Sequence, residues 1–333
     1  TGEWNLVLAH ALDYEMLIFT SHDMKNWQLQ SSFGKGLGAQ GGVWECPDLF
    51  ELPVEGTDDT KWVLLCNINP DGPFGGSGTQ YFVGDFDGKT FKADTDKDGK
   101  VATKWLDYGK DHYATVTWSD APDNRRVAIG WMSNWQYAAD VPTIQFRSVN
   151  TLPREMGLFR APAGEIYASC APSPELEALR GKLVQKASRA TVGKKQRVYS
   201  LPTANDGLCE LLFDIDAAKS SAVAITLSND KGEKVVMLYD AASRTLSFDR
   251  TESGIIDFSE GFPAVTATPT HEINGKISLR LYVDRSSIEV FGNDGRFVMT
   301  NLVFPTKPYT TLSLSSADGK AKIENLKIYS INE

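Results

Sequence analysis

The amino-acid sequence predicts an all-β protein in which a propeller-like array of small sheets is followed by a β-sandwich. The first half carries an internal repeat, and the second half carries evenly spaced strands without that repeat. Short β-branched and aromatic runs alternate with turn dipeptides along almost the whole chain. These dipeptides are Asp71-Gly72, Asp87-Gly88, Asp98-Gly99, Asp206-Gly207, Asn274-Gly275, Asp294-Gly295 and Asp318-Gly319.

The repeat in the first half has a period of about 60 residues and predicts small antiparallel sheets. Residues 23–27 and 87–91 share the pattern Asp-x-Lys-x-aromatic, and each follows two strand-like runs. A third unit keeps its first strand at residues 126–131. Such units suit the blades of a β-propeller. Because the first unit lacks its opening strand, we expect the three visible units not to close a ring.

A short helix is predicted at the joint between the two halves. Ser173 is a candidate cap, Pro174 suits the first turn, and Gly181 suits the end of the helix. We therefore divide the chain into residues 1–172, a propeller part, and residues 173–333, the linker helix and the β-sandwich.

Length, charge and cysteine spacing exclude several classes of function. The 333 residues, 41% of them hydrophobic, can bury the cores of about two domains. A formal net charge of -9 argues against a nucleic-acid partner. No apolar run approaches the roughly 20 residues of a membrane span. The four cysteines form no CxxC pair and have no histidine at ligand spacing, so we expect no metal site.

The segment VWECPDL at residues 43–49 contains the most informative carboxylate. Glu45 lies between Trp44 and Cys46, a setting that can partly desolvate it and favour its protonated form. Such an acid suits proton donation in catalysis. A structural acid at the end of a strand is the alternative, and these residues alone leave both open.

Several segments in combination resemble glycoside hydrolase family 32, the β-fructosidases that include invertases, inulinases and levanases. These segments are WECPDLFELP, INPDGPFGGSGTQYFVGDFDG, LDYGKDHYA, WMSNWQYAADVPT and VDRSSIEVFGNDG. The resemblance spans the whole chain and implies a five-bladed β-propeller, of which residues 1–172 are the C-terminal part, followed by a β-sandwich. It also implies release of fructose from terminal β-D-fructofuranosyl linkages of levan, inulin or sucrose with retention of configuration. No cofactor is implied, and the expected location is extracellular or periplasmic.

The resemblance also assigns roles to individual residues. It makes Glu45 the general acid/base of a retaining double displacement. Trp135 resembles a fructose-contacting tryptophan, since an indole face suits a sugar ring, although a core aromatic is the alternative. Asp111 and Tyr113 fall in a motif that reaches the pocket rim in relatives. Asp111 could bond substrate hydroxyls, keep Glu45 protonated by repulsion, or simply cap a turn.

The resemblance leaves the nucleophile outside these residues. The Asn-Asp-Pro and Arg-Asp-Pro motifs of the family precede the ECP motif, and neither occurs in residues 1–333. We therefore expect a polypeptide of these residues alone to be inactive. The rival hypothesis is a non-catalytic carbohydrate-binding fragment. A related family that acts on arabinan is less favoured, because it lacks ECP followed by this sandwich. Asp48 and the segment WMSNWQYA favour a microbial exo-acting inulinase or levanase over an invertase.

Two further motifs resemble ligand loops. The glycine-rich residues 75–78 are not followed by Lys-Ser/Thr, so a loop beside the pocket is favoured over a phosphate site. Asp94, Asp96 and Asp98 begin like a calcium loop, but its twelfth position is Trp105. A solvated connection between strands is therefore expected there.

Overall fold

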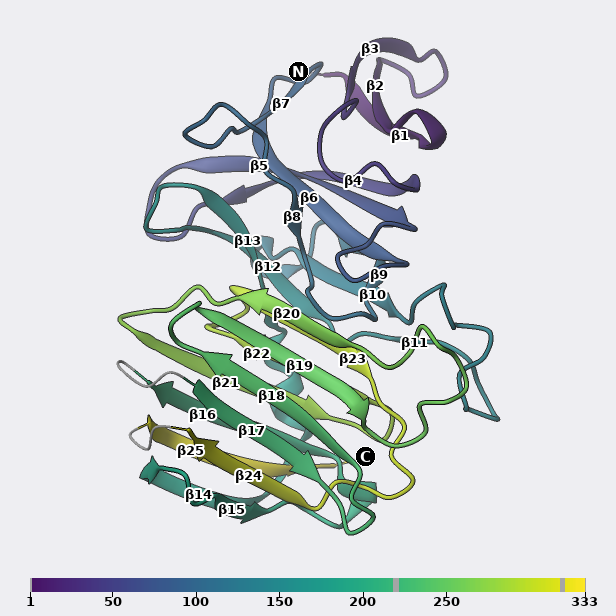
Figure 1. The fold of residues 1–333 in the computed structure, drawn as a ribbon. Coiled ribbons are helices and arrows are strands. Elements are labelled where there is room, and N and C mark those ends of the chain that lie inside the picture. The colour runs from purple at the N-terminus through teal and green to yellow at the C-terminus, as the bar shows by residue number, and fades with distance from the viewer. Residues whose placement is uncertain (1, 218–221, 318–320, 333) are drawn as a thin grey trace.

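The computed structural model describes residues 2–217, 222–317 and 321–332, and it is built from five antiparallel β-sheets (Figure 1). Three small sheets follow one another in the first half of the chain. Two six-stranded sheets pack face to face in the second half. The predicted all-β fold, a propeller part followed by a β-sandwich, is confirmed.

The propeller part consists of three sheets with strand orders β1-β2-β3, β4-β5-β6-β7 and β11-β10-β12-β13. Strand β8 pairs with β6, and strand β9 pairs with β10. The elements of this part are β1 (Trp4–His10), η1 (Ala11–Asp13), β2 (Glu15–Ser21), β3 (Gln28–Phe33), β4 (Val43–Pro53), β5 (Thr60–Asn69), β6 (Gly78–Phe86), β7 (Phe91–Ala93), β8 (Lys104–Trp105), β9 (Tyr113–Trp118), η2 (Pro122–Asn124), β10 (Val127–Met132), β11 (Val149–Asn150), β12 (Arg154–Arg160) and β13 (Ile166–Pro172), where η denotes a 3₁₀ helix.

The repeated motif forms equivalent turns in the first two sheets. Between β2 and β3, Asp23 Oδ1 accepts hydrogen bonds from the backbone N–H groups of Lys25 and Asn26, both at 2.8 Å. Between β6 and β7, Asp87 Oδ1 accepts from the N–H groups of Lys89 at 2.9 Å and Thr90 at 2.7 Å. These bonds hold the pKa of both aspartates below its usual range. The same local chemistry therefore closes both hairpins, as the repeat predicts.

The sandwich consists of sheets with the orders β14-β25-β16-β21-β22-β23 and β15-β24-β17-β18-β19-β20. Apolar side chains alternate along its strands, as Val223, Ile225 and Leu227 do on β17, and fill the space between the sheets. The elements of this part are η3 (Pro174–Leu179), β14 (Arg180–Val192), β15 (Arg197–Ser200), η4 (Asn205–Gly207), β16 (Cys209–Asp216), β17 (Ala222–Ser228), β18 (Lys234–Asp240), β19 (Thr245–Glu252), β20 (Val265–Pro269), β21 (Lys276–Val283), β22 (Ser287–Gly292), β23 (Phe297–Leu302), β24 (Thr311–Ser316) and β25 (Ala321–Ile331).

The joint differs in detail from the predicted helix. It is the 3₁₀ helix η3, with Pro174 in its first turn as expected. Ser173 is the N-cap residue of η3, as predicted, but its hydroxyl makes no capping hydrogen bond. Gly181 lies inside β14 instead of ending the helix, because that strand begins directly at Arg180. The division of the chain after residue 172 stays a prediction.

A buried ion-pair network fastens the propeller part to the sandwich. Arg154 of β12 donates to Asp107 at 2.8 Å and to Glu289 of β22 at 2.7 Å, and its side chain is fully buried. Burial and Arg154 act in opposite directions on the pKa of Asp107, which ends below its usual value because Arg154 and several hydrogen bonds favour the charged form. The network therefore depends on the Arg154 guanidinium.

Replacing Arg154 with leucine should destabilise the protein by about 3–5 kcal/mol, because two buried carboxylates lose their cation. Urea unfolding measures this loss. Arg125→Leu is the control, since Arg125 pairs with the exposed carboxylate of Glu175 and should matter much less. Equal losses in the two variants would show that burial of the Arg154 network does not set its contribution.

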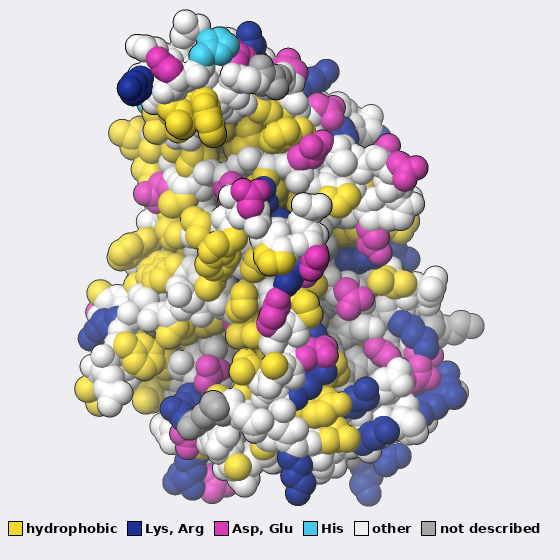
Figure 2. Space-filling model, turned by 180° about the vertical axis from the view of Figure 1, so that it is seen from behind, with side chains coloured by type: hydrophobic (Ala, Val, Ile, Leu, Met, Phe, Trp, Pro, Cys, Tyr) yellow, Lys and Arg dark blue, Asp and Glu magenta, His cyan; other side chains and the backbone are white. Residues whose placement is uncertain are grey.

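Large hydrophobic side chains lie exposed on the propeller part, and Figure 2 shows one face on which such side chains gather. Trp4, Leu6 and Leu8 of β1 are exposed, as are Val116 and Trp118 of β9. These residues lie on the first and last of the three propeller sheets. In the part of the chain that the structure describes, no helix is long and apolar enough to cross a bilayer.

Candidate active site

Glu45 lies on β4 beside a β-bulge. The pairing with β5 steps from Glu45 opposite Asn67 to Asp48 opposite Leu65, so two residues of β4 face one residue of β5. Cys46 takes up the irregularity with a φ of 46°, in the left-handed region that non-glycine residues rarely adopt. Bulges of this kind re-aim the side chains next to them. The local backbone therefore sets the direction of the Glu45 side chain.

Tyr113 of β9 is the group that contacts the Glu45 carboxylate. Its hydroxyl donates a hydrogen bond to Glu45 Oε2. Burial, and then this hydrogen bond, raise the pKa of Tyr113, so the phenol remains protonated and acts as the donor. Trp44, which we expected beside the carboxylate, packs in an apolar cluster with Leu64 and Phe82. The predicted environment of Glu45 is thus corrected: its neighbour is a tyrosine hydroxyl.

A buried polar network beneath the bulge was not predicted. Asn67 Nδ2 donates to the carbonyl of Cys46 at 3.2 Å, and Asn67 Oδ1 accepts from Thr79 Oγ1 at 2.6 Å and Thr115 N at 3.1 Å. Thr115 Oγ1 bonds in turn to His112 Nε2 at 2.8 Å. Burial lowers the pKa of His112 to about 3, so its imidazole is neutral. In the sequence, the one indication of this network is that the polar Asn67 directly follows the apolar run WVLLC.

Asp48, on β4 at the other side of the bulge, is hydrogen-bonded to strand β9. Its Oδ2 accepts hydrogen bonds from Thr117 N at 3.2 Å and from Thr117 Oγ1 at 2.5 Å. Arg126 Nη1 donates to that threonine hydroxyl at 3.1 Å. Asp48 therefore ties β4 to β9, the two strands that carry Glu45 and Tyr113.

Aromatic side chains extend from Tyr113 to an exposed tryptophan. The ring of Trp131 on β10 lies 6.2 Å from that of Tyr113 and 5.1 Å from that of Trp135. The Trp135 side chain follows β10 in a loop and is 61% exposed. Trp135 is therefore not a core residue, and its indole is available at the surface beside Trp131, whose ring lies between it and Tyr113.

The glycine-rich loop supports the segment that carries Trp135. Ser77 Oγ accepts a hydrogen bond from Trp135 N at 3.1 Å, and Asn134 Nδ2 donates to the carbonyl of Gly75 at 3.3 Å. Gly76 has a φ of +69°, and a Cβ there would lie 2.0 Å from Asn134 Oδ1. Only glycine meets both conditions. The loop thus packs against the segment that carries Trp135, and its place beside a pocket stays a prediction.

Asp111 does not lie at the substrate surface. Its side chain is fully buried, with Oδ2 accepting from Arg250 Nη1 at 2.5 Å and from Leu302 N at 2.8 Å. Oδ1 accepts from the Tyr137 hydroxyl at 2.6 Å. The prediction that Asp111 bonds substrate is corrected, because both of its oxygens are already engaged. Repulsion of Glu45 is disfavoured too, since Arg250 compensates the charge.

The loop of Asp94, Asp96 and Asp98 before β8 is held together by hydrogen bonds from its own backbone N–H groups. Asp96 Oδ1 accepts from the N–H groups of Asp98 and Lys100, both at 2.9 Å. Within residues 2–217, 222–317 and 321–332, no group of three or more His, Cys, Asp or Glu side chains could hold a metal ion.

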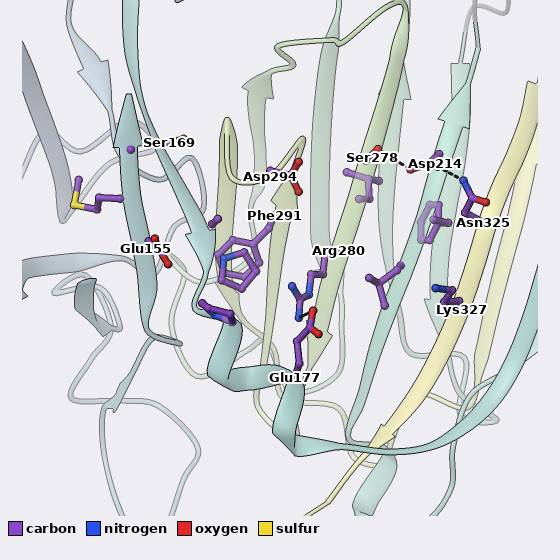
Figure 3. A pocket seen from close by; sticks show the side chains of 18 residues that line it. Glu155, Ser169, Glu177, Asp214, Ser278, Arg280, Phe291, Asp294, Asn325 and Lys327 are labelled. Carbon is purple, nitrogen blue, oxygen red and sulfur yellow. Dashed lines mark hydrogen bonds and ion pairs between the residues drawn. The ribbon is translucent and has the colours of Figure 1, made fainter. Parts of the chain in front are cut away.

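A cavity of about 710 Å³ lies between the propeller part and the sandwich (Figure 3). Glu155 and Ser169 line it from β12 and β13, and Asp214, Arg280 and Lys327 face them from the sandwich. Its lining includes neither Glu45 nor the aromatic side chains beside it. The candidate active site therefore lies elsewhere, where β4, β9 and the loop after β10 meet.

Two family models match almost the whole of this chain. Residues 1–168 match the model described as the glycosyl hydrolases family 32 N-terminal domain, and residues 175–330 match the model described as glycosyl hydrolases family 32 C terminal. A levanase of Bacillus subtilis is 40% identical over 99% of this chain and 49% of its own length. An extracellular exo-inulinase of Aspergillus awamori is 37% identical over 99% of this chain and 62% of its own length.

Solved structures share the fold over nearly the whole chain. The crystal structure of the Aspergillus awamori exo-inulinase superimposes with a TM-score of 0.87 at 34% identity, covering 99% of this chain and 65% of that one. A β-fructofuranosidase of Schwanniomyces occidentalis complexed with fructosyl-erythritol gives a TM-score of 0.84 at 26% identity, covering 99% and 68%. The chain thus spans about half to two thirds of the length of these relatives.

Proposed function

Because this chain belongs to glycoside hydrolase family 32, we propose that the complete protein releases fructose from terminal β-D-fructofuranosyl linkages of levan, inulin or sucrose. The levanase and the exo-inulinases among the relatives favour a fructan as the main substrate. The extracellular exo-inulinases also favour action outside the cell. The observation that carries the proposal is the hydrogen-bonded Glu45–Tyr113 pair, which Trp131 links to the exposed indole of Trp135.

Glu45 is the proposed general acid/base. In the first step its proton passes to the leaving oxygen while a second carboxylate attacks the anomeric carbon and forms a glycosyl-enzyme intermediate. In the second step Glu45 takes a proton from water, which displaces that carboxylate and frees fructose with retained configuration. Tyr113 orients the Glu45 carboxyl through its hydroxyl. We place the nucleophile in the remainder of the complete protein, since residues 1–333 hold no Asn-Asp-Pro segment.

Digestion of sucrose, inulin and levan with the complete protein tests this function. Release of free fructose from the chain ends, followed by chromatography, supports an exo-acting β-fructosidase. Binding of these carbohydrates without any release of fructose would instead favour the rival hypothesis, a non-catalytic carbohydrate-binding protein.

Trp135→Ala should lower kcat/KM by roughly tenfold. An aromatic contact adds about 0.5–1.5 kcal/mol beyond area burial, and 1.4 kcal/mol corresponds to tenfold. The indole is proposed to stack on the terminal fructosyl ring in both the ground and the transition state, so binding weakens as well. Steady-state kinetics with sucrose measures the change.

Trp62→Ala is the matched control for Trp135→Ala. Trp62 on β5 packs its ring 5.0 Å from that of Phe86, within the apolar cluster of the second sheet. Its loss should lower the unfolding temperature and leave kcat/KM unchanged. If Trp62→Ala impairs catalysis selectively while Trp135→Ala only destabilises the protein, the two roles have been assigned the wrong way round.

A further inference from the structure

Residues 107–111 of the propeller part run along the edge of a sandwich sheet. Strand β23 ends the order β14-β25-β16-β21-β22-β23. Along it, Tyr108 N donates to the carbonyl of Val298 at 2.8 Å and Asp111 N donates to that of Thr300 at 3.1 Å. The sandwich therefore determines the path of this segment.

Two buried aspartate side chains complete that edge. Asp107 Oδ1 accepts from Thr300 N at 2.8 Å, and Asp111 Oδ2 accepts from Leu302 N at 2.8 Å. Each carboxylate takes a backbone N–H of β23 that a neighbouring strand would otherwise bind. The segment is thus fixed at both of its ends.

Arg250 of β19 supplies the cation that Asp111 needs. Its Nη1 lies 2.5 Å from Asp111 Oδ2, and its Nη2 donates to the Tyr137 hydroxyl at 2.7 Å, which in turn bonds Asp111 Oδ1 at 2.6 Å. Both charged side chains are fully buried. A buried carboxylate is held in place only when it is paired and hydrogen-bonded. Arg250 therefore fixes Asp111 with a rigid, directional contact.

Asp111, which Arg250 holds in place, lies two residues before Tyr113, the residue that contacts Glu45. Tyr113 follows Asp111 by two positions and donates its hydroxyl to Glu45. A cavity of about 710 Å³ also lies between β12–β13 and the outer face of the same sandwich sheet, away from this segment (Figure 3). The position of Tyr113 thus depends on the anchored segment.

We propose that Arg250, acting through Asp111, is a positioning residue for the Glu45–Tyr113 pair. The sandwich then contributes to catalysis by holding the general acid where it meets the leaving oxygen. Neither Arg250 nor Asp111 contacts the substrate; both act through the backbone between residues 111 and 113. This inference rests on the proposed function of Glu45.

Asp111→Asn in the complete protein tests the inference, because it removes the charge and keeps the side-chain shape. The value of kcat for sucrose should fall about 10-fold to 100-fold, as expected for a misplaced catalytic group, while KM changes little. The loss should be smaller for an aryl β-fructofuranoside with an acidic phenol, because that group departs without protonation. A purely structural role would not distinguish the two substrates.

Val223→Ala is the control for stability. Val223 is fully buried in the sandwich core, so its truncation destabilises the same half of the molecule. Assayed below its unfolding temperature, it should keep the kcat of the unmodified protein on both substrates. Arg250→Lys is the second variant, which keeps the buried positive charge but loses the planar fork; the same selective loss is expected, and it stands in if Asp111→Asn fails to fold.

The outcomes separate the two proposals. If the unmodified complete protein releases no fructose, the proposed function is wrong, and the positioning role is wrong with it. If that protein is active and a folded Asp111→Asn or Arg250→Lys variant keeps its kcat, or loses it equally on both substrates, only the positioning role is overturned.

Discussion

Replacing Glu45 with glutamine in the complete protein should lower kcat for sucrose, inulin and levan by about 10²–10⁴-fold. The amide has the shape of the carboxyl group but cannot pass a proton to the leaving oxygen. Substrate binding should persist, because the proposed fructose contact at Trp135 is untouched. The loss should shrink for a substrate whose leaving group departs without a proton. Steady-state kinetics on both kinds of substrate measures the effect.

Glu51→Gln is the matched control for Glu45→Gln. Glu51 lies on the same strand, β4, and its exposed side chain accepts a hydrogen bond from Thr60. This variant should keep the unmodified kcat on every substrate. A Glu45→Gln protein that hydrolyses sucrose or inulin at nearly the unmodified rate would show that another group donates the proton.

The parts of the fold that local chemistry determines could be predicted from the sequence. Asp23 and Asp87 each close a hairpin by accepting backbone hydrogen bonds within three residues, so their pattern is readable in the sequence. Alternating apolar residues likewise predict the sandwich strands such as β17. The joint was only partly predictable. The chain leaves η3 directly into β14, and no local signal determines whether Ser173 caps the helix.

The sequence indicated candidate residues for the site but not the contacts that those residues make. Glu45 and Tyr113 lie 68 positions apart in the sequence, and only the packing of the sheet that holds β4 against the sheet that holds β9 brings them together. Asp111 and Arg250 lie 139 positions apart and on different halves of the molecule. Asp111 stands in the same short motif as Tyr113, so the sequence suggested a similar role for both. Tertiary packing turns the two side chains to different partners.

We propose that residues 1–333 hold the acid of a two-carboxylate site and that the nucleophile lies in the remainder of the complete protein. Retaining hydrolysis needs both groups on opposite sides of one anomeric carbon. The exposed apolar side chains of β1 and β9 suit the packing of further propeller sheets that would carry the second group. On this proposal, the first step needs those sheets, because they would supply the partner of Glu45.

Fructose release from sucrose, inulin and levan by a polypeptide of residues 1–333, compared with release by the complete protein, tests where the nucleophile lies. The complete protein should release fructose, and the shorter polypeptide should release none. Adding a separate polypeptide that carries the remaining propeller sheets should restore activity if the ring reassembles. Hydrolysis by residues 1–333 alone at a rate near that of the complete protein would contradict the claim, because the nucleophile would then have to be one of the carboxylates in this chain.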